Sequence, residues 1–385
     1  MDITPYLKLM VDKSASDLFF HVGAPVNIKI GGVVRPIGNK VLAPGQVREI
    51  AYSVMKDDQI KEFEHEWELN FAIPLQGVGR FRSNVFRQRG EVSMVIRYIK
   101  GDIPQVEELG LPPLLRQLVM EKRGLIMLVG ATGSGKSTTL AAMIDHRNSS
   151  APGHIITIED PIEFTHQHKK SVIAQREIGI DTHDYENALR SAMREAPDVI
   201  LVGEVRAREV MKYVLTFSET GHLVLSTLHA NNANGALDRI VNFFPEDVRP
   251  QLLLDLSLNL RAIVSQRLVR SLTGGLVPAV EVLLNTPYIA DLIQKGKIDY
   301  VKDAMEQSTE SGTQTFDQSL FKLYREGKIS KEEAIKNADS KNNVGLKIRL
   351  AESAEATSVG RQAANLADLA IHDEDEDDRG RAFGV

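Results

Sequence analysis

The residue types with the clearest chemistry form one short glycine-rich run. Gly130-Ala131-Thr132-Gly133-Ser134-Gly135-Lys136-Ser137-Thr138 follows an apolar segment, 125–129, and opens a helical one, 139–147. Glycines let backbone N–H groups converge on phosphate oxygens, and the start of the following helix adds partial positive charge to the same anion site. We therefore predict a Walker A phosphate-binding loop for ATP. The predicted nucleotide-binding residues are Thr132, Gly133, Ser134, Gly135, Lys136, Ser137 and Thr138, with Lys136 at the β- and γ-phosphates and the Ser137 hydroxyl on Mg²⁺.

Acidic residues end two further apolar segments. The run Glu159-Asp160-Pro161-Ile162-Glu163 follows residues 155–158, and Glu204 follows residues 199–203. Ligands of open α/β sheets lie at the carboxyl ends of the strands. Glu163 is the candidate that orients the attacking water, although a solvated acidic turn would have the same composition. Glu204 has the Walker B position, where it would hold Mg²⁺ or help poise the water, whereas Asp198 at the far end of the segment would cap it.

Two histidines flank another buried segment. His222 and His229 lie at the two ends of residues 222–229. A zinc site does not fit, because two histidines seven apart on a strand point to opposite faces and the chain has no cysteine to complete the site. A lone histidine is usually structural, and the sequence by itself leaves their role open.

A hairpin in the first hundred residues sets two arginines opposite each other. If Arg89 and Gly90 form the loop between residues 80–88 and 91–99, Arg82 faces Arg97. Like charges directly opposite on a sheet destabilise it, so we infer that an anion is meant to lie over them. A neighbouring subunit's nucleotide would supply that anion, with the arginines acting in trans. Two solvated arginines that lean apart are the alternative.

The elements that must position these residues fall into two patterns. Residues 1–100 alternate short strands with a helix and predict a small α/β domain on an antiparallel sheet, and residues 101–113, rich in proline and glycine, read as a linker. From residue 114 to 285, continuous apolar strands alternate with helices, which is typical of a parallel sheet covered on both faces. Residues 286–350 predict a small helical appendage, and residues 351–385, with six acids from Asp373 to Asp378, predict a disordered tail.

Composition excludes several classes of protein. The chain has 385 residues, of which 43% are hydrophobic and 25% charged, as in ordinary folded proteins. The absence of cysteine excludes disulfides and cysteine nucleophiles. The net charge of −6 gives no drive toward nucleic acid, so no nucleic-acid partner is expected. No signal peptide or membrane-spanning run stands out, and we expect a cytoplasmic protein.

The motifs together resemble the secretion ATPase superfamily. Its four motifs occur in order, as the Walker A loop, the acidic box 159–163, the segment 198–204 and the histidine box 222–229. Residues 79–84 and 315–317 are similar to type IV pilus retraction ATPases, the PilT and PilU group. The resemblance implies a PAS-like N-terminal domain, a RecA-like ATPase domain, a homohexameric ring and a peripheral place at the inner-membrane base of a pilus machine, docked on its platform protein.

Carried over by position, the resemblance also assigns roles. Glu163 becomes the catalytic glutamate, Glu204 the Walker B acid, and Arg82 and Arg97 the arginines that face the phosphates. It further implies that His222 takes part in nucleotide binding and His229 in γ-phosphate sensing or subunit coupling.

Departures from the PilT pattern favour a PilU-type ATPase, an accessory motor that works with a PilT-type partner. PilT-type motors usually carry acids where this chain has Ala196 and Ala207, a different helix motif in place of residues 288–293, and no acidic tail.

Other functions stay open at this point. A PilT-type primary motor is one alternative, and a pilus-assembly or type II secretion ATPase is another, although such proteins are commonly longer at the N-terminus. A nucleic-acid motor shares RecA-like cores, and an ATP-binding ring partner with little turnover would keep the same loop.

Overall fold

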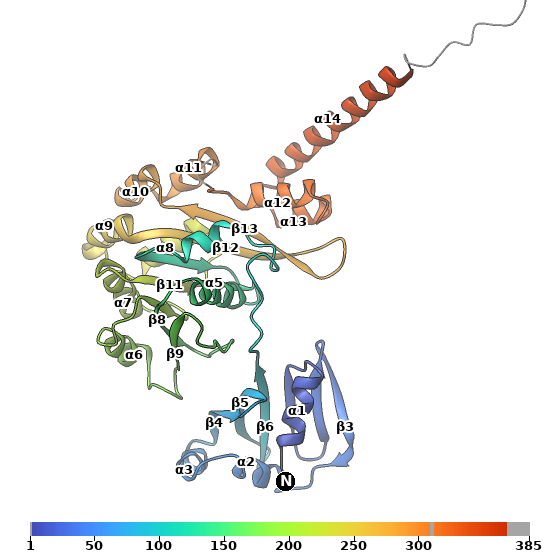
Figure 1. Ribbon diagram of the computed structural model, residues 1–385, viewed down its shortest axis with the longest axis vertical. Helices are drawn as coiled ribbons and strands as arrows, with labels where there is room; N and C mark the ends of the chain where they lie inside the picture. The colour runs from blue at the N-terminus through green and yellow to red at the C-terminus, as the bar shows by residue number, and fades with distance from the viewer. Residues whose placement is uncertain (1, 309–311, 368–385) are drawn as a thin grey trace, which may run out of the picture. The chain divides into compact units, whose positions relative to one another are not determined.

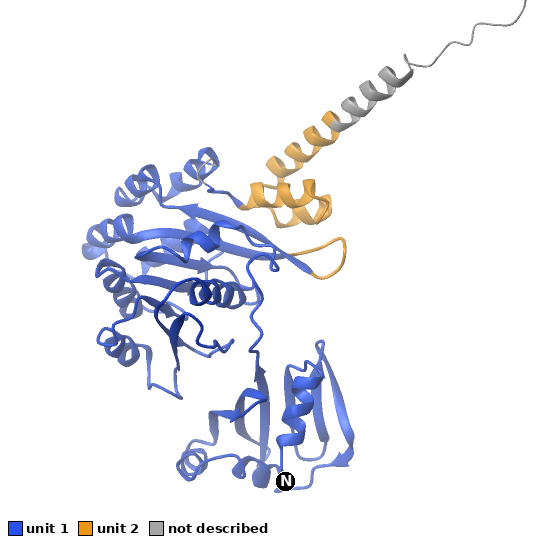
Figure 2. Cartoon of the chain, in the orientation of Figure 1, with its two compact units in different colours: residues 1–268, 276–315 blue, residues 269–275, 316–385 orange. Residues whose placement is uncertain are grey.

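The computed structural model describes residues 2–308 and 312–367, with side chains as far as residue 354. These residues form two compact units (Figure 2). Unit 1 contains residues 1–268 and 276–315, and unit 2 contains residues 269–275 together with the chain from residue 316 onward. Among the described residues, no helix is both long and apolar enough to cross a membrane.

An antiparallel sheet of six strands organises the first hundred residues, in the order β3-β2-β1-β6-β5-β4 (Figure 1). The strands are β1 (Asp17–Phe20), β2 (Pro25–Ile30), β3 (Val33–Val41), β4 (Glu68–Leu75), β5 (Gly79–Gln88) and β6 (Glu91–Ile99). Three helices, α1 (Thr4–Asp12), α2 (Gln46–Tyr52) and α3 (Asp57–Glu66), share one apolar core with this sheet, in which Phe20, Phe63 and Phe81 are fully buried. The predicted α/β domain on an antiparallel sheet is confirmed, although α1 and α3 were not predicted.

The hairpin between β5 and β6 has the predicted register. Arg89 and Gly90 form its tight turn, both with positive φ (52° and 80°), and Gln88 pairs with Glu91. Arg82 consequently lies opposite Arg97. Positive φ at both loop residues matches the turn type whose twist suits two-residue hairpins, which is why the loop length fixed the pairing.

A second sheet holds the Walker motifs. Its seven strands run in the order β13-β12-β7-β11-β10-β8-β9, and every pair from β12 to β9 is parallel. The strands are β7 (Gly124–Val129), β8 (Gly153–Glu159), β9 (Ser171–Glu177), β10 (Val199–Val202), β11 (Leu223–Leu228), β12 (Leu260–Arg270) and β13 (Leu276–Leu284). Strands β9 and β12 were not predicted, because polar residues such as Gln175 and Gln266 interrupt their apolar pattern.

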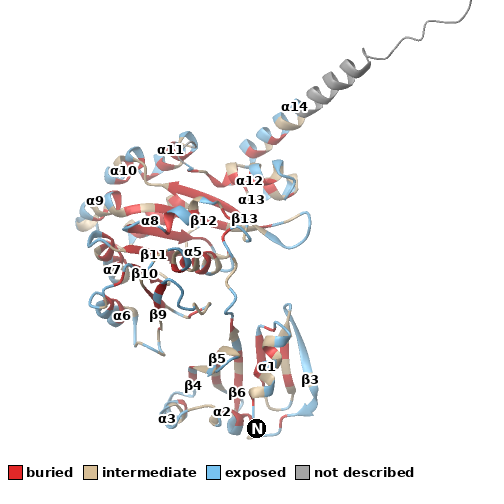
Figure 3. Ribbon diagram, in the orientation of Figure 1, coloured by how far each residue is buried: buried red, intermediate tan, exposed pale blue. Residues whose placement is uncertain are grey.

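Helices cover both faces of this sheet, as the continuous apolar strands predict. Along β7, Leu125, Met127 and Val129 enter one apolar core while Ile126 and Leu128 enter another, since successive side chains of a strand point to opposite faces. Every residue of the central strands β7, β10 and β11 is accordingly buried, as the strands in Figure 3 illustrate. The helices of this region are α4 (Leu114–Leu118), α5 (Lys136–Ser150), α6 (Tyr185–Ala192), α7 (Arg208–Glu219), α8 (Ala233–Asn242), α9 (Arg249–Asn259), α10 (Pro287–Gln294) and α11 (Val301–Gln307), with short 3₁₀ turns at Glu246–Val248 and Ile298–Tyr300.

Unit 2 is built from α12 (Phe316–Arg325), α13 (Lys331–Asn337) and α14 (Lys341–Ala367). Helices α10 and α11 belong to unit 1, so the residues predicted as one helical region, 286–350, divide at residue 315. The proposed division into an N-terminal domain, a linker, an ATPase domain, a helical region and a tail remains a prediction.

The stretch predicted as a disordered tail, residues 351–385, is helical in its first part. The backbone of residues 351–367 continues α14, because this stretch has no proline and several alanines, which favour the helix. The acidic run Asp373–Asp378 lies outside the described residues.

Candidate active site

Four neighbouring strands end at one edge of the parallel sheet, and the predicted site residues follow them there. The phosphate-binding loop continues β7, His229 follows β11, Glu204 follows β10, and Glu159 ends β8. A cavity of about 840 Å³ lies at this edge. Its lining includes Thr132, Gly133, Gly135, Lys136, Ser137, Thr138, Glu163, Glu204 and His229. The fold therefore brings together residues that are up to a hundred positions apart in sequence.

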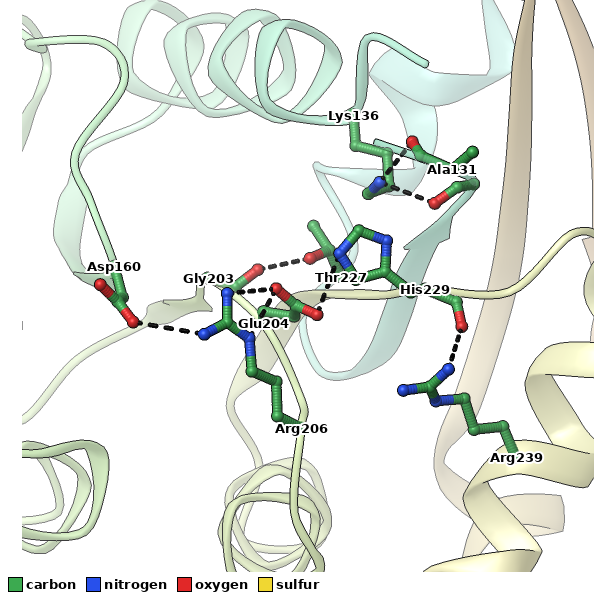
Figure 4. Close-up of polar contacts among 10 residues, drawn as sticks. Ala131, Lys136, Asp160, Gly203, Glu204, Arg206, Thr227, His229 and Arg239 are labelled. Atoms are coloured by element: carbon green, nitrogen blue, oxygen red, sulfur yellow. Dashed lines mark hydrogen bonds and ion pairs between the residues drawn. The ribbon is translucent and has the colours of Figure 1, made fainter. Parts of the chain in front are cut away.

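The loop after β7 has the backbone that a phosphate-binding loop requires. Gly130, Gly133 and Gly135 have φ of 152°, 78° and 91°, which residues with side chains rarely adopt. The Nζ atom of Lys136 donates to the carbonyl oxygens of Gly130 (2.7 Å) and Ala131 (2.9 Å), so the lysine folds back over the loop (Figure 4). Burial lowers the pKa of Lys136, and the nearby Glu204 carboxylate acts in the opposite direction. The predicted strand, loop and helix are confirmed.

Glu204 is the centre of a polar cluster just after the carboxyl end of β10 (Figure 4). Its side chain is 14% exposed, and its Oε2 lies 2.9 Å from the Arg206 guanidinium. Its Oε1 lies 3.2 Å from Nε2 of His229. Arg206 also approaches Asp160, at 3.5 Å. The carboxylate is thus held between a cation and an imidazole, facing the lysine of the phosphate-binding loop.

The acid that ends β8, Glu159, and the acid that follows the strand, Glu163, have different surroundings. Glu159 accepts hydrogen bonds from the Thr157 hydroxyl at 2.7 Å and from the Gln175 amide at 3.3 Å. Burial raises the pKa of Glu159 to about 7, although these two hydrogen bonds act to lower it. Glu163 is exposed and lines the cavity. An exposed carboxylate beside the phosphate-binding loop can accept a hydrogen bond from a water that enters the cavity, whereas Glu159, which also lines the cavity, already accepts hydrogen bonds from Thr157 and Gln175.

His222 does not reach this edge of the sheet. It precedes β11, at the opposite end of the strand from His229, and six strand residues separate the two by roughly 20 Å. Its Nδ1 contacts the Phe217 carbonyl at 3.0 Å, and its ring packs edge-on against the Phe217 ring at 5.6 Å. These contacts give His222 a part in packing α7 against β11, and the described structure does not bring it to the nucleotide loop.

The two arginines of the N-terminal hairpin both have acidic neighbours. Arg97 donates from Nε to Asp17 at 2.9 Å, and Asp17 is buried on the adjoining strand β1. Arg82 lies 3.8 Å from Glu177, at the end of β9. Part of the expected repulsion between the arginines is therefore relieved within the chain.

Magnesium fits the donor set of this cavity. The Ser137 hydroxyl and the Glu204 carboxylate offer oxygen ligands, which Mg²⁺ prefers, and both line the cavity. Among residues 2–308 and 312–354, no group of three or more potential ligands gathers into a metal cage. Since Mg²⁺ is commonly held by one or two protein oxygens together with substrate phosphates, Ser137 and Glu204 are the residues that would hold it.

Some residues of the site were not foreseen. Arg206 binds Glu204 and Asp160 from the loop after β10, and the Arg239 guanidinium fixes the His229 carbonyl at 2.9 Å. A charged residue that follows a Walker B strand was the only available signal for Arg206. Arg239 is on α8, and nothing in the sequence points to its contact.

A phosphate-binding loop at the carboxyl edge of a parallel sheet, with acids delivered by the neighbouring strands, defines a P-loop ATPase. The chain belongs to the type II/IV secretion system protein family, whose model matches residues 2–335. The ATPase predicted from the sequence, and its place in the secretion ATPase superfamily, are confirmed.

Individual relatives agree with the family. The chain is 50% identical over 384 residues to the type IV pilus ATPase PilU of Pseudomonas aeruginosa, covering 100% of both chains. It is 42% identical over 343 residues to the type IV pilus retraction ATPase PilT of the same organism, covering 89% of this chain and 100% of PilT. A crystal structure of the pilus retraction motor PilT with bound ADP matches with a TM-score of 0.83 and 41% identity, covering 88% of this chain and 98% of that one.

Proposed function

We propose that this chain is an ATP-hydrolysing hexameric motor of the type IV pilus machinery that acts in pilus retraction as a PilU-type accessory ATPase. The observation that carries the proposal is the convergence of Lys136, Glu163, Glu204 and His229 on one cavity at the edge of the parallel sheet. The full-length similarity to PilU supports the choice of machine and of subtype.

The loop amides and Lys136 bind the phosphates of ATP. To reach the β- and γ-phosphates, the ammonium group exchanges the Gly130 and Ala131 carbonyls for phosphate oxygens. This exchange is favourable because charge-assisted hydrogen bonds to phosphate are stronger than bonds to neutral carbonyls. When Mg²⁺ is bound through Ser137 and Glu204, it neutralises charge on the phosphates.

Glu163 orients the water that attacks the γ-phosphorus. The new P–O bond forms as the bond to the β–γ bridging oxygen breaks, which releases ADP and inorganic phosphate, and the proton of the water leaves through Glu163. His229, held by Glu204 at 3.2 Å, is placed to respond to the γ-phosphate and to pass its presence to the subunit boundary.

Arg82 and Arg97 act on the nucleotide of a neighbouring subunit. They lie opposite each other on β5 and β6, so one anion can contact both guanidinium groups. Their carboxylate partners within the chain, Glu177 and Asp17, hold them until a phosphate competes. Arginine supplied in trans makes hydrolysis depend on the ring, and movement about the linker 101–113 supplies the mechanical step.

The partners follow from the same proposal. They are five further copies of the chain, a PilT-type retraction ATPase and the platform protein of the pilus at the cytoplasmic face of the inner membrane. Nucleic acid is not among them, since the net charge is −6.

The test measures steady-state ATPase activity and pilus retraction for the wild type, Lys136→Ala and Glu163→Gln, each with and without a PilT-type partner. We expect Lys136→Ala to lose ATP binding, and Glu163→Gln to bind ATP but turn over about a hundredfold more slowly. Glu186→Gln is the matched control, because Glu186 is an exposed acid on α6 that pairs only with Arg190 among the contacts described.

Three outcomes would contradict the proposal. An unchanged rate in Glu163→Gln would indicate a ring partner with little turnover of its own. Retraction by this chain without a PilT-type partner would indicate a primary motor. Stimulation of the ATPase by single-stranded DNA, with steep salt dependence, would indicate a nucleic-acid motor.

A further inference from the structure

Gln266 lies beneath the phosphate-binding loop although no motif contains it. It belongs to β12, which runs parallel to β7, and its neighbour Ser265 pairs with Val129, the last residue before the loop. Gln266 is 4% exposed. A buried polar side chain at this position needs hydrogen-bond partners, and the loop is what it meets.

Three parts of Gln266 meet three parts of the loop and its helix. A Cβ atom on Gly130 would lie 2.6 Å from the backbone carbonyl oxygen of Gln266, and a Cβ atom on Gly135 would lie 2.7 Å from the side-chain Nε2 of Gln266. The Gln266 Oε1 accepts a hydrogen bond from the Thr139 hydroxyl at 2.8 Å, in the first turn of α5. One residue thus touches the first glycine of the loop, the last glycine and the helix that follows.

We propose that Gln266 is a positioning residue that sets the shape of the phosphate-binding loop and thereby its affinity for nucleotide. Loop amides bind phosphate strongly only when they are already aimed at it, because reorganisation at the moment of binding weakens the interaction. Gln266 supplies that alignment from below: its amide fills the space beside Gly135, and its Oε1 fixes the turn that starts with Lys136. The inference rests on the proposed ATPase function of the same loop.

The opposite face of β12 offers a matched control. Ser265 is also buried, but its side chain points away from the loop, and its Oγ donates to Glu281 at 2.8 Å. A residue that only fills the core would behave like Ser265, so that its loss would change stability and leave nucleotide affinity as it was.

The test compares the dissociation constant for a fluorescent ADP analogue, and the melting temperature without nucleotide, in the full-length chain. Gln266→Met keeps the volume and removes both polar groups, and we expect the dissociation constant to rise roughly tenfold. Gln266→Glu keeps an acceptor for Thr139 but introduces a carboxyl group beneath the phosphates, so we expect a larger rise that grows with pH as the carboxyl ionises. Ser265→Ala keeps the wild-type dissociation constant.

A second pair of variants decides the matter if Gln266 variants do not fold. Thr139→Val removes the donor to Gln266 and raises the dissociation constant, whereas Thr139→Ser keeps the hydroxyl and the affinity. Wild-type affinity in all Gln266 and Thr139 variants, with only the melting temperature lowered, overturns the inference alone. A wild-type chain with no affinity for ADP overturns the proposed function and this inference with it.

Discussion

The two sheets of unit 1 place their charged residues by different means. In the antiparallel sheet, Arg82 and Arg97 come from one hairpin and face each other across β5 and β6. In the parallel sheet, Lys136 and Glu204 come from separate crossovers and meet only because β7 and β10 end at the same edge. A hairpin determines its contacts locally, whereas a parallel sheet gathers contacts from distant segments.

The two sheets are therefore expected to contribute differently to catalysis and to folding stability. The parallel sheet concentrates groups with perturbed pKa values at one edge, among them Lys136 and Glu159. The antiparallel sheet pairs its charges, as Arg97 does with Asp17. We therefore expect substitutions of Lys136 and Glu204 at the edge of the parallel sheet to change turnover, and substitution of Asp17, which pairs with an arginine in the hairpin sheet, to change stability first.

The largest effect is expected from glycine substitutions that contrast the two sheets. Gly130→Ala places a Cβ atom 2.6 Å from a backbone carbonyl oxygen at φ 152°, and we expect it to cost about 3 kcal/mol of stability and to abolish ADP binding. Gly90→Ala, at φ 80° with open space around it, is the control and costs about 1 kcal/mol. Urea unfolding and ADP titration measure both, and normal ADP binding by Gly130→Ala would contradict the role of the loop.

Neutralising the acid at the end of β10 should have the next largest effect. Glu204→Gln removes the carboxylate that faces Lys136, and we expect kcat/KM for Mg·ATP to fall about a hundredfold, which corresponds to about 2.7 kcal/mol. The Mg²⁺ concentration for half-maximal activity should also rise, as a magnesium titration at fixed ATP would show. An unchanged magnesium requirement would leave Glu204 without a metal role.

A third prediction concerns the pH dependence of stability. The pKa of Glu159 is about 7 in the fold against 4.5 as its ordinary value, so the folded chain binds the extra proton between these values. The stabilisation from protonated Glu159 is complete below pH 4.5 and is lost as the pH rises through 7. Glu159→Gln should therefore match the wild type near pH 4.5 and exceed it at pH 8 by on the order of 3 kcal/mol. Melting temperatures of both proteins at both pH values measure this. The same difference between the variant and the wild type at pH 4.5 and at pH 8 would contradict the prediction.

The smallest effect is expected in the hairpin sheet. Asp17→Asn weakens the 2.9 Å contact with Arg97, and we expect it to cost about 1–2 kcal/mol of stability while the ATPase rate of the assembled ring is kept. Arg97→Ala should instead lower that rate, because the neighbour's phosphates lose a cation. Equal rates for the two variants would leave Arg97 with a structural role only.

Much of this arrangement was predictable because its signals are local. The glycines from Gly130 to Gly135 and the apolar strand before them predict a phosphate-binding loop, and the structure confirms the strand, the loop and the helix. The Arg82 to Arg97 register followed from a two-residue turn. The membership in the secretion ATPase family followed from the order of four motifs and is confirmed.

Other features could not be predicted from any single segment of the sequence. The two histidines of residues 222–229 look equivalent in sequence, yet only His229 lies at the nucleotide edge, because strand direction decides which end faces the loop. Polar residues within 171–177 and 260–270 interrupt the apolar pattern, so strands β9 and β12 are recognised only from their pairing in the sheet.

The sequence alone determined the strand, loop and helix around residues 130–138 and predicted a phosphate-binding loop there, since backbone freedom and charge in this run depend on residue type and spacing only. The tertiary structure decided which distant groups serve that loop. Gln266 lies under it, Arg206 holds Glu204, and His222 is turned away. These contacts join strands that are neighbours in the sheet but far apart in the chain, and the order of strands in a parallel sheet is set by how its helices pack rather than by any one segment.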